Sequence, residues 1–387
     1  DMRSESTILV FVAYYLPGYK AGGPIRSIAN MVELLGEEFH FKIVTADRDT
    51  SDIIPYPNIK VDDWNRVGKA EVYYCSPGNN GLMHLKKLIT KTDYDILYLN
   101  SFFSYSFSIK PLLLHKLGLI PKRPVVLAPR GEFSKGALRI RSFKKHCYIH
   151  VMRLLGLCNN VTWQASSNYE KEDICSALGN HAVIRVAKNL PSPIKNLSSK
   201  TPETSAGRLK VIFLSRISPK KNLDYALRVL QKVNVPLTFN IYGVIDDQRY
   251  WQACRLEIER LPENIKVKYH GDIPHSQVGP TLQQQDLFLF PTKGENYGHV
   301  IYEALTAGVP VLISDQTPWD DIEQHRAGWA FPLNNKEKYV SCIQEYASTD
   351  STTRKRMREG AMKYAKDILT HSGTLEANRN LFLKRIK

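Results

Sequence analysis

The chain alternates short apolar runs with segments of helical periodicity, and this alternation limits the folds open to it. In the first half, "TILVFVAYYL" (7–16) and "FHFKIVTAD" (39–47) enclose "PIRSIANMVELLGEE" (24–38), whose apolar residues recur at helical spacing. Continuous apolar strands joined by helices form parallel sheets that are covered on both faces. The sequence therefore predicts an α/β fold with doubly wound sheets.

The same alternation starts again after a polar stretch that has no periodicity. "LKVIFLSR" (209–216) predicts a strand, "LDYALRVLQKV" (223–233) a helix and "LTFNIYG" (237–243) a strand. At 387 residues the chain is also too long for one typical hydrophobic core. We expect an N-terminal Rossmann-like domain at 1–190, a linker at 191–208, a C-terminal Rossmann-like domain at 209–370, and a helix at 371–387 that packs back on the first domain.

The charge of the chain is unusual, whereas its apolar content is that of an ordinary globular protein. A net charge of +15 favours an anionic partner such as a nucleotide, a nucleic acid or an acidic membrane face. Six scattered cysteines without a Cys-x-x-Cys pair indicate reduced thiols and a cytosolic protein. The run "ILVFVAYYL" (8–16) is about half the length that spans a bilayer, so we interpret it as a buried strand and not as a signal peptide.

Two carboxylates lie in the segment "PTKGENYGHVIYEALTAGVPVLISD" (291–315), which has the pattern strand, loop, helix, strand. Glu295 falls in the loop, and Glu303 falls in the first turns of the helix. Ligands of open parallel sheets bind beyond the carboxyl ends of the strands, where this loop lies. Glu303 could accept two hydrogen bonds from a ribose diol, and Glu295 could hold sugar hydroxyls. The alternative is two surface glutamates favoured by the helix dipole.

Basic residues follow the strand at 209–214 in "FLSRISPKKNLDYAL". Arg216 and Lys221 lie at the entrance of a helix, where cations beside free backbone N–H groups can form a diphosphate clamp. The alternative is a solvated helix start. A second anion-binding feature is the backbone that leads into the helix carrying Glu303; it comprises Asn296, Tyr297, Gly298, His299 and Val300.

Other motifs carry weaker signals. Gly22 and Gly23 form a tight strand-to-helix turn whose amides could approach a phosphate, but the spacing is neither that of a dinucleotide fingerprint nor that of a P-loop. His146 and His150 share a helix face without a His-Glu-x-x-His motif. We therefore expect no metal site and no cofactor.

The stretch from Lys110 to Arg153 contains eleven Lys or Arg residues and a single acid, Glu132. Its second half interleaves bases with apolar and aromatic residues, which is typical of an interfacial amphipathic segment. The alternatives are a solvated helix face and a nucleic-acid-binding surface. No helix-turn-helix or RNP-type motif accompanies the stretch to support a nucleic-acid-binding surface.

Several motifs together resemble those of retaining family 4 glycosyltransferases. "GENYGHVIYEALTAGVPVL" resembles their signature of two glutamates separated by seven residues, and "SRISPKKN" resembles their Gly-Arg-x-x-x-x-Lys-Gly element, with Asn222 at the last Gly. "AGGPIRSIANMVELL" resembles their N-terminal Gly-Gly loop and helix. "APRGEFSKGAL" and "DQTPWDDIEQHRAGWAFPL" are similar to a bacterial surface-polysaccharide subgroup.

The resemblance implies the GT-B architecture, which is two facing doubly wound domains, and a set of site residues. Arg216 and Lys221 would hold the diphosphate of a UDP- or GDP-sugar, Glu303 the ribose, and Glu295 with the 296–300 backbone the sugar and distal phosphate. This chain has Arg130 where many relatives have a histidine. The further substrate contacts that we expect are Gly22, Gly23, Arg130, Gly243, Gly271 and Ile273.

These inferences predict a metal-independent, retaining glycosyltransferase without a cofactor. Its donor is a nucleotide-diphosphate-sugar, its acceptor a saccharide that is lipid-diphosphate-linked, and its location the cytoplasmic face of an anionic inner membrane. We expect no nucleic-acid partner. The alternatives are another enzyme of the same architecture, such as a nucleotide-sugar epimerase or a phosphorylase, and a basic nucleic-acid-binding protein.

Overall fold

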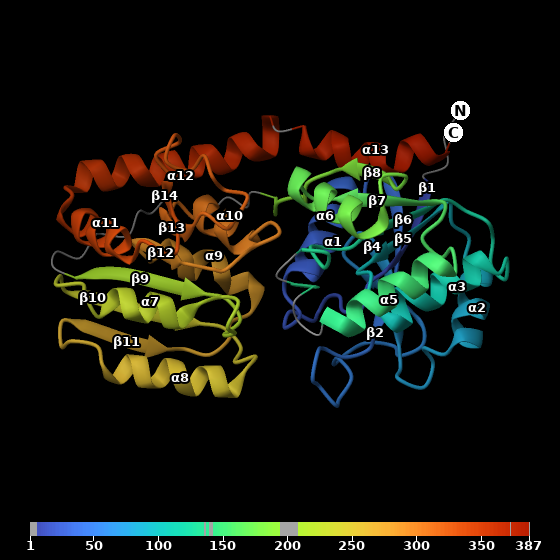
Figure 1. Cartoon of the computed structure of the whole chain (residues 1–387), viewed down its shortest axis with the longest axis horizontal. Coiled ribbons are helices and arrows are strands. Elements are labelled where there is room, and N and C mark those ends of the chain that lie inside the picture. Colours follow the sequence, from blue (N-terminus) through green and yellow to red (C-terminus); the bar gives the residue numbers. More distant parts are fainter. Residues whose placement is uncertain (1–5, 135–136, 139–141, 194–207, 372, 387) are drawn as a thin grey trace. The chain divides into compact units, whose positions relative to one another are not determined.

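A computed structural model describes residues 6–134, 137–138, 142–193, 208–371 and 373–386 (Figure 1). The chain divides into two compact units, one formed by residues 1–193 and 373–387 and the other by residues 194–372. Most of the expected linker, 194–207, lies outside the described residues. Each unit is a parallel α/β structure with its own core, so the predicted class of two doubly wound Rossmann-like domains is confirmed.

The described residues of the first unit form an eight-stranded sheet in the order β3-β4-β2-β1-β5-β6-β7-β8. All neighbouring strands are parallel except β3 and β4, which pair antiparallel at one edge. Its strands are β1 (Ser6–Phe11), β2 (Phe39–Ala46), β3 (Trp64–Val67), β4 (Ala70–Cys75), β5 (Ile96–Asn100), β6 (Val125–Ala128), β7 (Val161–Ala165) and β8 (Val183–Val186). Its helices are α1 (Gly23–Leu35), α2 (Leu82–Lys91), the π-helix η1 (Tyr105–Ile109), α3 (Lys110–Lys116), α5 (Ser142–Leu154), α6 (Asn168–Leu178) and α13 (Thr374–Ile386).

The described residues of the second unit form a six-stranded parallel sheet in the order β11-β10-β9-β12-β13-β14. Its strands are β9 (Leu209–Leu214), β10 (Leu237–Tyr242), β11 (Ile265–Tyr269), β12 (Leu287–Phe290), β13 (Val311–Ser314) and β14 (Gly328–Phe331). Its helices are α7 (Leu223–Leu230), α8 (Gln248–Glu259), α9 (His275–Gln283), α10 (His299–Thr306), α11 (Lys336–Ser348) and α12 (Ser351–His371). The direction of winding reverses between β9 and β12, and parallel sheets bind ligands at such a reversal.

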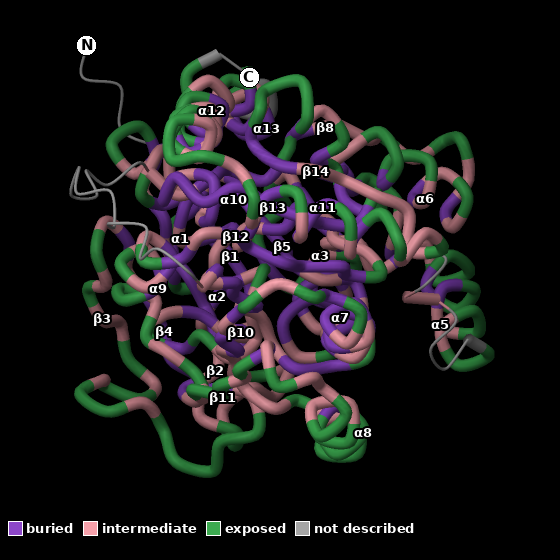
Figure 2. Tube along the Cα trace, turned by 90° about the vertical axis from the view of Figure 1, so that its left-hand side faces the viewer, coloured by how far each residue is buried: buried purple, intermediate pink, exposed green. Residues whose placement is uncertain are grey.

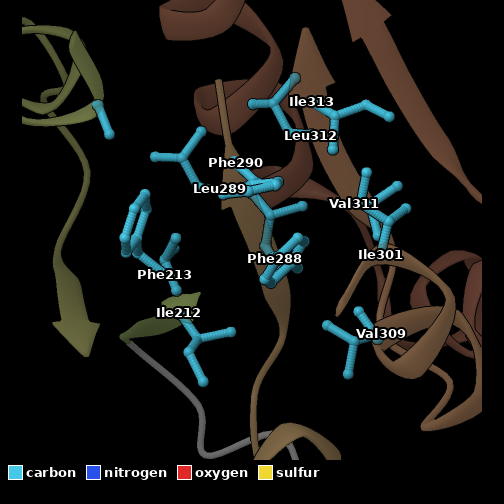
Figure 3. Packing of buried hydrophobic residues seen from close by; sticks show 14 of the residues in the cluster. Ile212, Phe213, Phe288, Leu289, Phe290, Ile301, Val309, Val311, Leu312 and Ile313 are labelled. Carbon is cyan, nitrogen blue, oxygen red and sulfur yellow. The ribbon is translucent and has the colours of Figure 1, made fainter. Parts of the chain in front are cut away.

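The central strands of the second unit are apolar on both faces, as the sequence predicts. Figure 3 shows Phe288, Leu289 and Phe290 of β12 packed among the side chains of β9, β13 and Ile301 of α10. Each fully buried side chain of this size contributes about 1.5–3 kcal/mol of transfer free energy. In Figure 2 the tube is purple along most strands and green along much of α5 and α8. This rigid sheet holds the loops at its carboxyl edge.

The last helix, α13, belongs to the first unit although it follows the second unit in sequence. Phe382 is fully buried, and its ring makes edge contacts with Phe39 at 5.5 Å and with Tyr98 at 5.4 Å between centroids. Asn378 donates to the carbonyl of Lys188 at 2.8 Å. Aromatic burial and a backbone hydrogen bond therefore attach the end of the chain to the first sheet.

Candidate functional site

Two loops at the carboxyl edge of the second sheet bring the predicted residues together. Residues 215–222 follow β9, and residues 291–298 follow β12, the strand beside it. The Asn222 amide donates to the carbonyl of Pro291 at 2.8 Å and joins the two loops. Asn222 has φ +63°, which is a left-handed conformation. Asparagine tolerates this conformation better than most residues do, and glycine tolerates it best. This geometry explains why the resembling motif has glycine at the same position.

Lys221 and Glu295 form a short ion pair in this region. The Lys221 ammonium lies 2.5 Å from Glu295 Oε1, and Thr292 Oγ1 lies 2.9 Å from the same oxygen. The two side chains are 13% and 11% exposed, so water screens the pair only weakly. The structure thus joins the predicted clamp lysine directly to the predicted loop carboxylate.

Arg216 pairs with a carboxylate that the sequence analysis did not assign to the site. Its guanidinium lies 3.2 Å from Asp246 Oδ2, and both side chains are at least 40% exposed. A surface pair of this kind contributes little, about 0–1 kcal/mol, and can open readily. The adjacent acids at 246–247 were visible in the sequence, but nothing in their spacing indicated that Asp246 would reach Arg216.

Glu303 has a histidine partner that the sequence analysis also missed. Glu303 Oε1 lies 2.8 Å from His275 Nε2, and the Glu303 side chain is 14% exposed. His275 is the first residue of α9, and Glu303 lies in the second turn of α10. These two helices follow different strands, so no local sequence pattern could connect the two residues.

The backbone at 296–300 leads into α10 as expected. Gly298 precedes the helix with φ +83°, and His299 and Val300 open its first turn. The Tyr297 ring is buried against Trp319, and burial raises the pKa of its hydroxyl. The Tyr297 side chain therefore belongs to the core, and its carbonyl accepts a hydrogen bond from Trp319 Nε1. Asn296 lies in the loop before it.

Gly243, Gly271 and Ile273 follow β10 and β11. Gly243 has a packing reason to be glycine: a β-carbon there would lie 1.8 Å from the carbonyl oxygen of Ser215. Gly271 has φ +76° and open space around it, so its backbone is accessible. Ile273 is half-buried and packs against the core of the second unit.

Lys220 lies closer to the site than its sequence position suggests. Its carbonyl accepts hydrogen bonds from Lys293 N at 2.9 Å and Thr292 Oγ1 at 3.3 Å. Protein atoms around its ammonium group lower the pKa of Lys220 by desolvation. The charges of Lys221 and Arg216 act in the same direction, and that of Glu295 opposes them. Lys220 thus lies among the charged groups of the clamp, although the sequence analysis did not assign it to the site.

In the first unit, the loop of Gly22 and Gly23 is braced by a carboxylate that the sequence analysis missed. Asp49 Oδ2 accepts hydrogen bonds from the backbone N–H groups of Tyr19 at 2.8 Å and Lys20 at 3.0 Å. Asp49 follows β2 and is 4% exposed. Gly22 has φ +76° and precedes α1, and Gly23 has open space where a β-carbon would lie. The turn is thus held in place with its backbone accessible.

Arg130 is committed to protein partners. Its guanidinium donates to Asn100 Oδ1 at 2.8 and 3.1 Å, to the Tyr98 hydroxyl at 2.8 Å, and to Asn189 Oδ1. Arg130 also has φ +56°, a strained conformation for a long side chain. These bonds use four of the five N–H groups of the guanidinium, so little donor capacity is left for a substrate.

Two carboxylates beside Arg130 bind backbone instead of the guanidinium. Glu132 accepts from Phe102 N at 2.5 Å and Phe103 N at 3.2 Å, and burial raises its pKa against the effect of these bonds. Glu170 accepts from Gly131 N at 2.5 Å. Among the described residues, no carboxylate oxygen lies within ion-pair distance of Arg130. This edge of the first sheet is therefore a network that fixes loops.

Solved structures share this architecture. HepE of Anabaena in complex with UDP and glucose superposes with a TM-score of 0.72 over 97% of this chain and 98% of its own, at 16% identity. The two Rossmann-like units thus have the GT-B fold. At this identity the likeness shows the fold alone.

The second unit also matches a sequence family. Residues 195–364 match the family model of glycosyl transferases group 1, and this range contains both loops of the candidate site. The match covers less than half of the chain and lies within the second unit.

Two curated relatives are similar over parts of the chain. An uncharacterized 41.2 kDa protein in the cps region of Klebsiella pneumoniae is 26% identical over 59% of this chain and 62% of its own length. O-antigen chain mannosyltransferase B of Escherichia coli is 25% identical over 29% of this chain and 30% of its own. The chain thus spans less than two thirds of either relative.

Proposed function

We propose that the protein transfers a sugar from a nucleotide-diphosphate-sugar to a saccharide acceptor. The observation that carries this proposal is the Lys221–Glu295 pair beside Arg216 and the start of α10, at the reversal point of the second sheet. The same segment matches the group 1 family model. HepE, which has the same fold, was solved with UDP and glucose. A site built from cations and helix N–H groups is suited to a diphosphate.

The residues have distinct roles in this proposal. Breaking the sugar–phosphate bond places negative charge on the leaving diphosphate, which Arg216, Lys221 and the α10 N-terminus stabilise. Glu303 accepts the ribose hydroxyls, and His275 orients its carboxylate. Glu295 faces the sugar and supports its developing positive charge. The cations take the place of a metal ion, and front-face attack without an enzymic nucleophile retains the anomeric configuration.

The proposal is tested by a thermal-shift screen with UDP- and GDP-sugars and the free nucleotides, because a ligand that binds the folded state raises the melting temperature. A positive donor is then incubated with saccharide acceptors, with and without EDTA, and the anomeric configuration of the product is determined by NMR. Turnover in EDTA with retention supports the mechanism. Stabilisation by nucleic acid but by no nucleotide-sugar would overturn the proposal.

We also propose that the acceptor is lipid-diphosphate-linked and that the enzyme works at the cytoplasmic face of an anionic membrane, in surface-polysaccharide assembly. Relatives named for a cps region and for an O-antigen chain favour this acceptor class. On α5, Phe143, Val151 and Leu154 are 81%, 50% and 74% exposed, and Lys144 and Arg153 lie on the same helix. Among the described residues, no helix is long and apolar enough to cross a membrane.

Charge reversal on this helix tests the membrane proposal. Bases near an anionic surface contribute about 1 kcal/mol each, so a few of them suffice for reversible attachment. Reversing Lys144 and Lys145 to Glu, together with Arg139 and Arg141, which lie outside the described residues, should abolish sedimentation with anionic liposomes and leave nucleotide-sugar binding intact. If the unaltered protein does not sediment with such liposomes at low salt, the membrane proposal is wrong and the transferase proposal stands.

A further inference from the structure

The cations around the second-unit loops differ in how they are neutralised. Lys221 is paired with Glu295 at 2.5 Å, and Arg216 is paired with Asp246 at 3.2 Å. Lys220 is exposed, and among the described residues its ammonium group has no hydrogen bond or ion pair. Lys220 is therefore a cation of these loops without an ion-pair partner among the described residues, and Lys293 of the second loop is another.

The backbone of Lys220 is fixed beside the reacting loop. Thr292 Oγ1 lies 3.3 Å from the Lys220 carbonyl and 2.9 Å from Glu295 Oε1, so a single hydroxyl links Lys220 to the loop carboxylate. Lys293 N donates to the same carbonyl at 2.9 Å. The turn is closed by Lys221 N donating to Ser218 O at 2.9 Å. The side chain of Lys220 thus starts from a rigid point within the cation cluster.

An exposed lysine in such a place has an unfavourable environment until an anion arrives. Nearby protein and the charges of Lys221 and Arg216 lower its pKa, so they disfavour its charged form. A bound phosphate would reverse this balance, because it adds negative charge next to the ammonium group. Binding would also reduce the repulsion between the lysine and its cationic neighbours.

We propose that Lys220 is a third cation of the site and contacts a phosphate group of the bound nucleotide. This inference rests on the proposed function and extends it, because the expected clamp comprises Arg216 and Lys221 alone. Arg216 and Lys221 are paired with Asp246 and Glu295, whereas the Lys220 ammonium group can meet an incoming diphosphate without breaking an ion pair. Its contribution should therefore grow with the number of phosphates on the ligand.

Calorimetric titration of the full chain with UDP, GDP, ADP and dTDP tests the proposal. Lys220→Gln should weaken binding of the preferred diphosphate about tenfold, as expected for loss of a charge-assisted contact at a partly exposed site. It should weaken the corresponding monophosphate less. Lys220→Arg should keep most of the affinity. Because the side chain makes no bond within the described residues and its charge is disfavoured there, the melting temperature of the Gln variant should not fall.

The control is Lys232→Gln, which removes a cation that lies past the far end of α7 and pairs with Glu337 at 2.9 Å. It should bind as the unaltered protein does, whereas Arg216→Gln should bind more weakly. If Lys220→Gln binds the diphosphate normally while Arg216→Gln does not, the role of Lys220 is wrong and the proposed function survives. If the unaltered protein binds none of the four diphosphates, both are overturned.

Discussion

The loops after β9, β10 and β12 in the second unit and those after β6 and β7 in the first unit neutralise charge in different ways. In the second unit, cations meet carboxylates as side-chain pairs: Lys221 with Glu295 and Arg216 with Asp246. In the first unit, Glu132 and Glu170 accept from backbone N–H groups, and Arg130 donates to neutral acceptors. A side-chain pair can exchange its partner for a ligand, whereas a carboxylate bonded to backbone cannot leave without loosening a loop. We therefore expect a charged ligand at these loops of the second unit, whereas the network in the first unit holds its loops in shape.

The largest effect is expected at the exchangeable pairs of the second unit. Lys221→Ala or Arg216→Ala should lower kcat/KM by about 10²–10³, because each removes a charge aimed at the leaving diphosphate. Both variants should also bind the nucleotide diphosphate more weakly. Steady-state kinetics and calorimetry measure the losses, with Lys232→Ala as the control. Losses as small as those of the control would show that these charges are ordinary surface charges.

A smaller effect, on stability, is expected in the network of the first unit. Arg130→Ala leaves the acceptors on Asn100, Asn189 and Tyr98 without their donor, and it should lower the free energy of unfolding by about 1–3 kcal/mol. Chemical denaturation measures this change. Arg130→His should not restore it, because an imidazole reaches at most two acceptors. A variant as stable as the unaltered protein, but inactive, would instead assign Arg130 to the substrate.

Variants of the two candidate-site glutamates, Glu303 and Glu295, should separate nucleotide binding from turnover. Glu303→Gln should weaken nucleotide binding about tenfold, because it replaces one of the two acceptor oxygens by an NH₂ donor and removes the negative charge. Glu295→Gln should depress the transfer rate with less effect on nucleotide diphosphate binding. Calorimetry and single-turnover rates give the two quantities. Normal nucleotide binding by a folded Glu303→Gln variant would contradict the ribose role.

The smallest effect concerns the attachment of α13 to the first unit. The Arg379 guanidinium binds Glu38, with 2.7 Å between Nη2 and Oε1, and this hydrogen bond lowers the pKa of Glu38. Because the pKa of Glu38 is lower in the folded state, its pair with Arg379 contributes to the free energy of unfolding above the pKa of Glu38 in the unfolded chain. This contribution is lost as the pH falls through the pKa of Glu38 in the folded state. Arg379→Gln should therefore lower the free energy of unfolding by under ~1 kcal/mol at pH 7. At strongly acidic pH, where Glu38 is protonated, the substitution should leave the free energy of unfolding unchanged.

Denaturation of the Arg379→Gln variant and the unaltered protein at several pH values checks this prediction. The difference between the two proteins should shrink as the pH falls. A difference that is constant across pH would show that Arg379 acts through packing and not through its ion pair.

Much of the fold followed from local pattern. Strands that are apolar on both faces, such as β12, alternate with helices that have one apolar face, such as α1. This alternation indicates parallel sheets whose two faces are covered by helices. The loop positions of Glu295 and Arg216 followed from the same pattern, because they come directly after predicted strands. The roles of these residues remain predictions.

The sequence by itself determined which residues lie at the carboxyl ends of strands, because the two-residue and 3.6-residue periodicities are local properties of the chain. It could not determine which of these residues meet. Strands or helices that are far apart in the chain bring three pairs together: Asp246 with Arg216, His275 with Glu303, and Asp49 with the Gly22 turn. Only the order of strands in the sheet decides those contacts, since a pairing between loops has no sequence period. The tertiary structure therefore decided the partners of the charges, and with them which charges are left to meet a ligand.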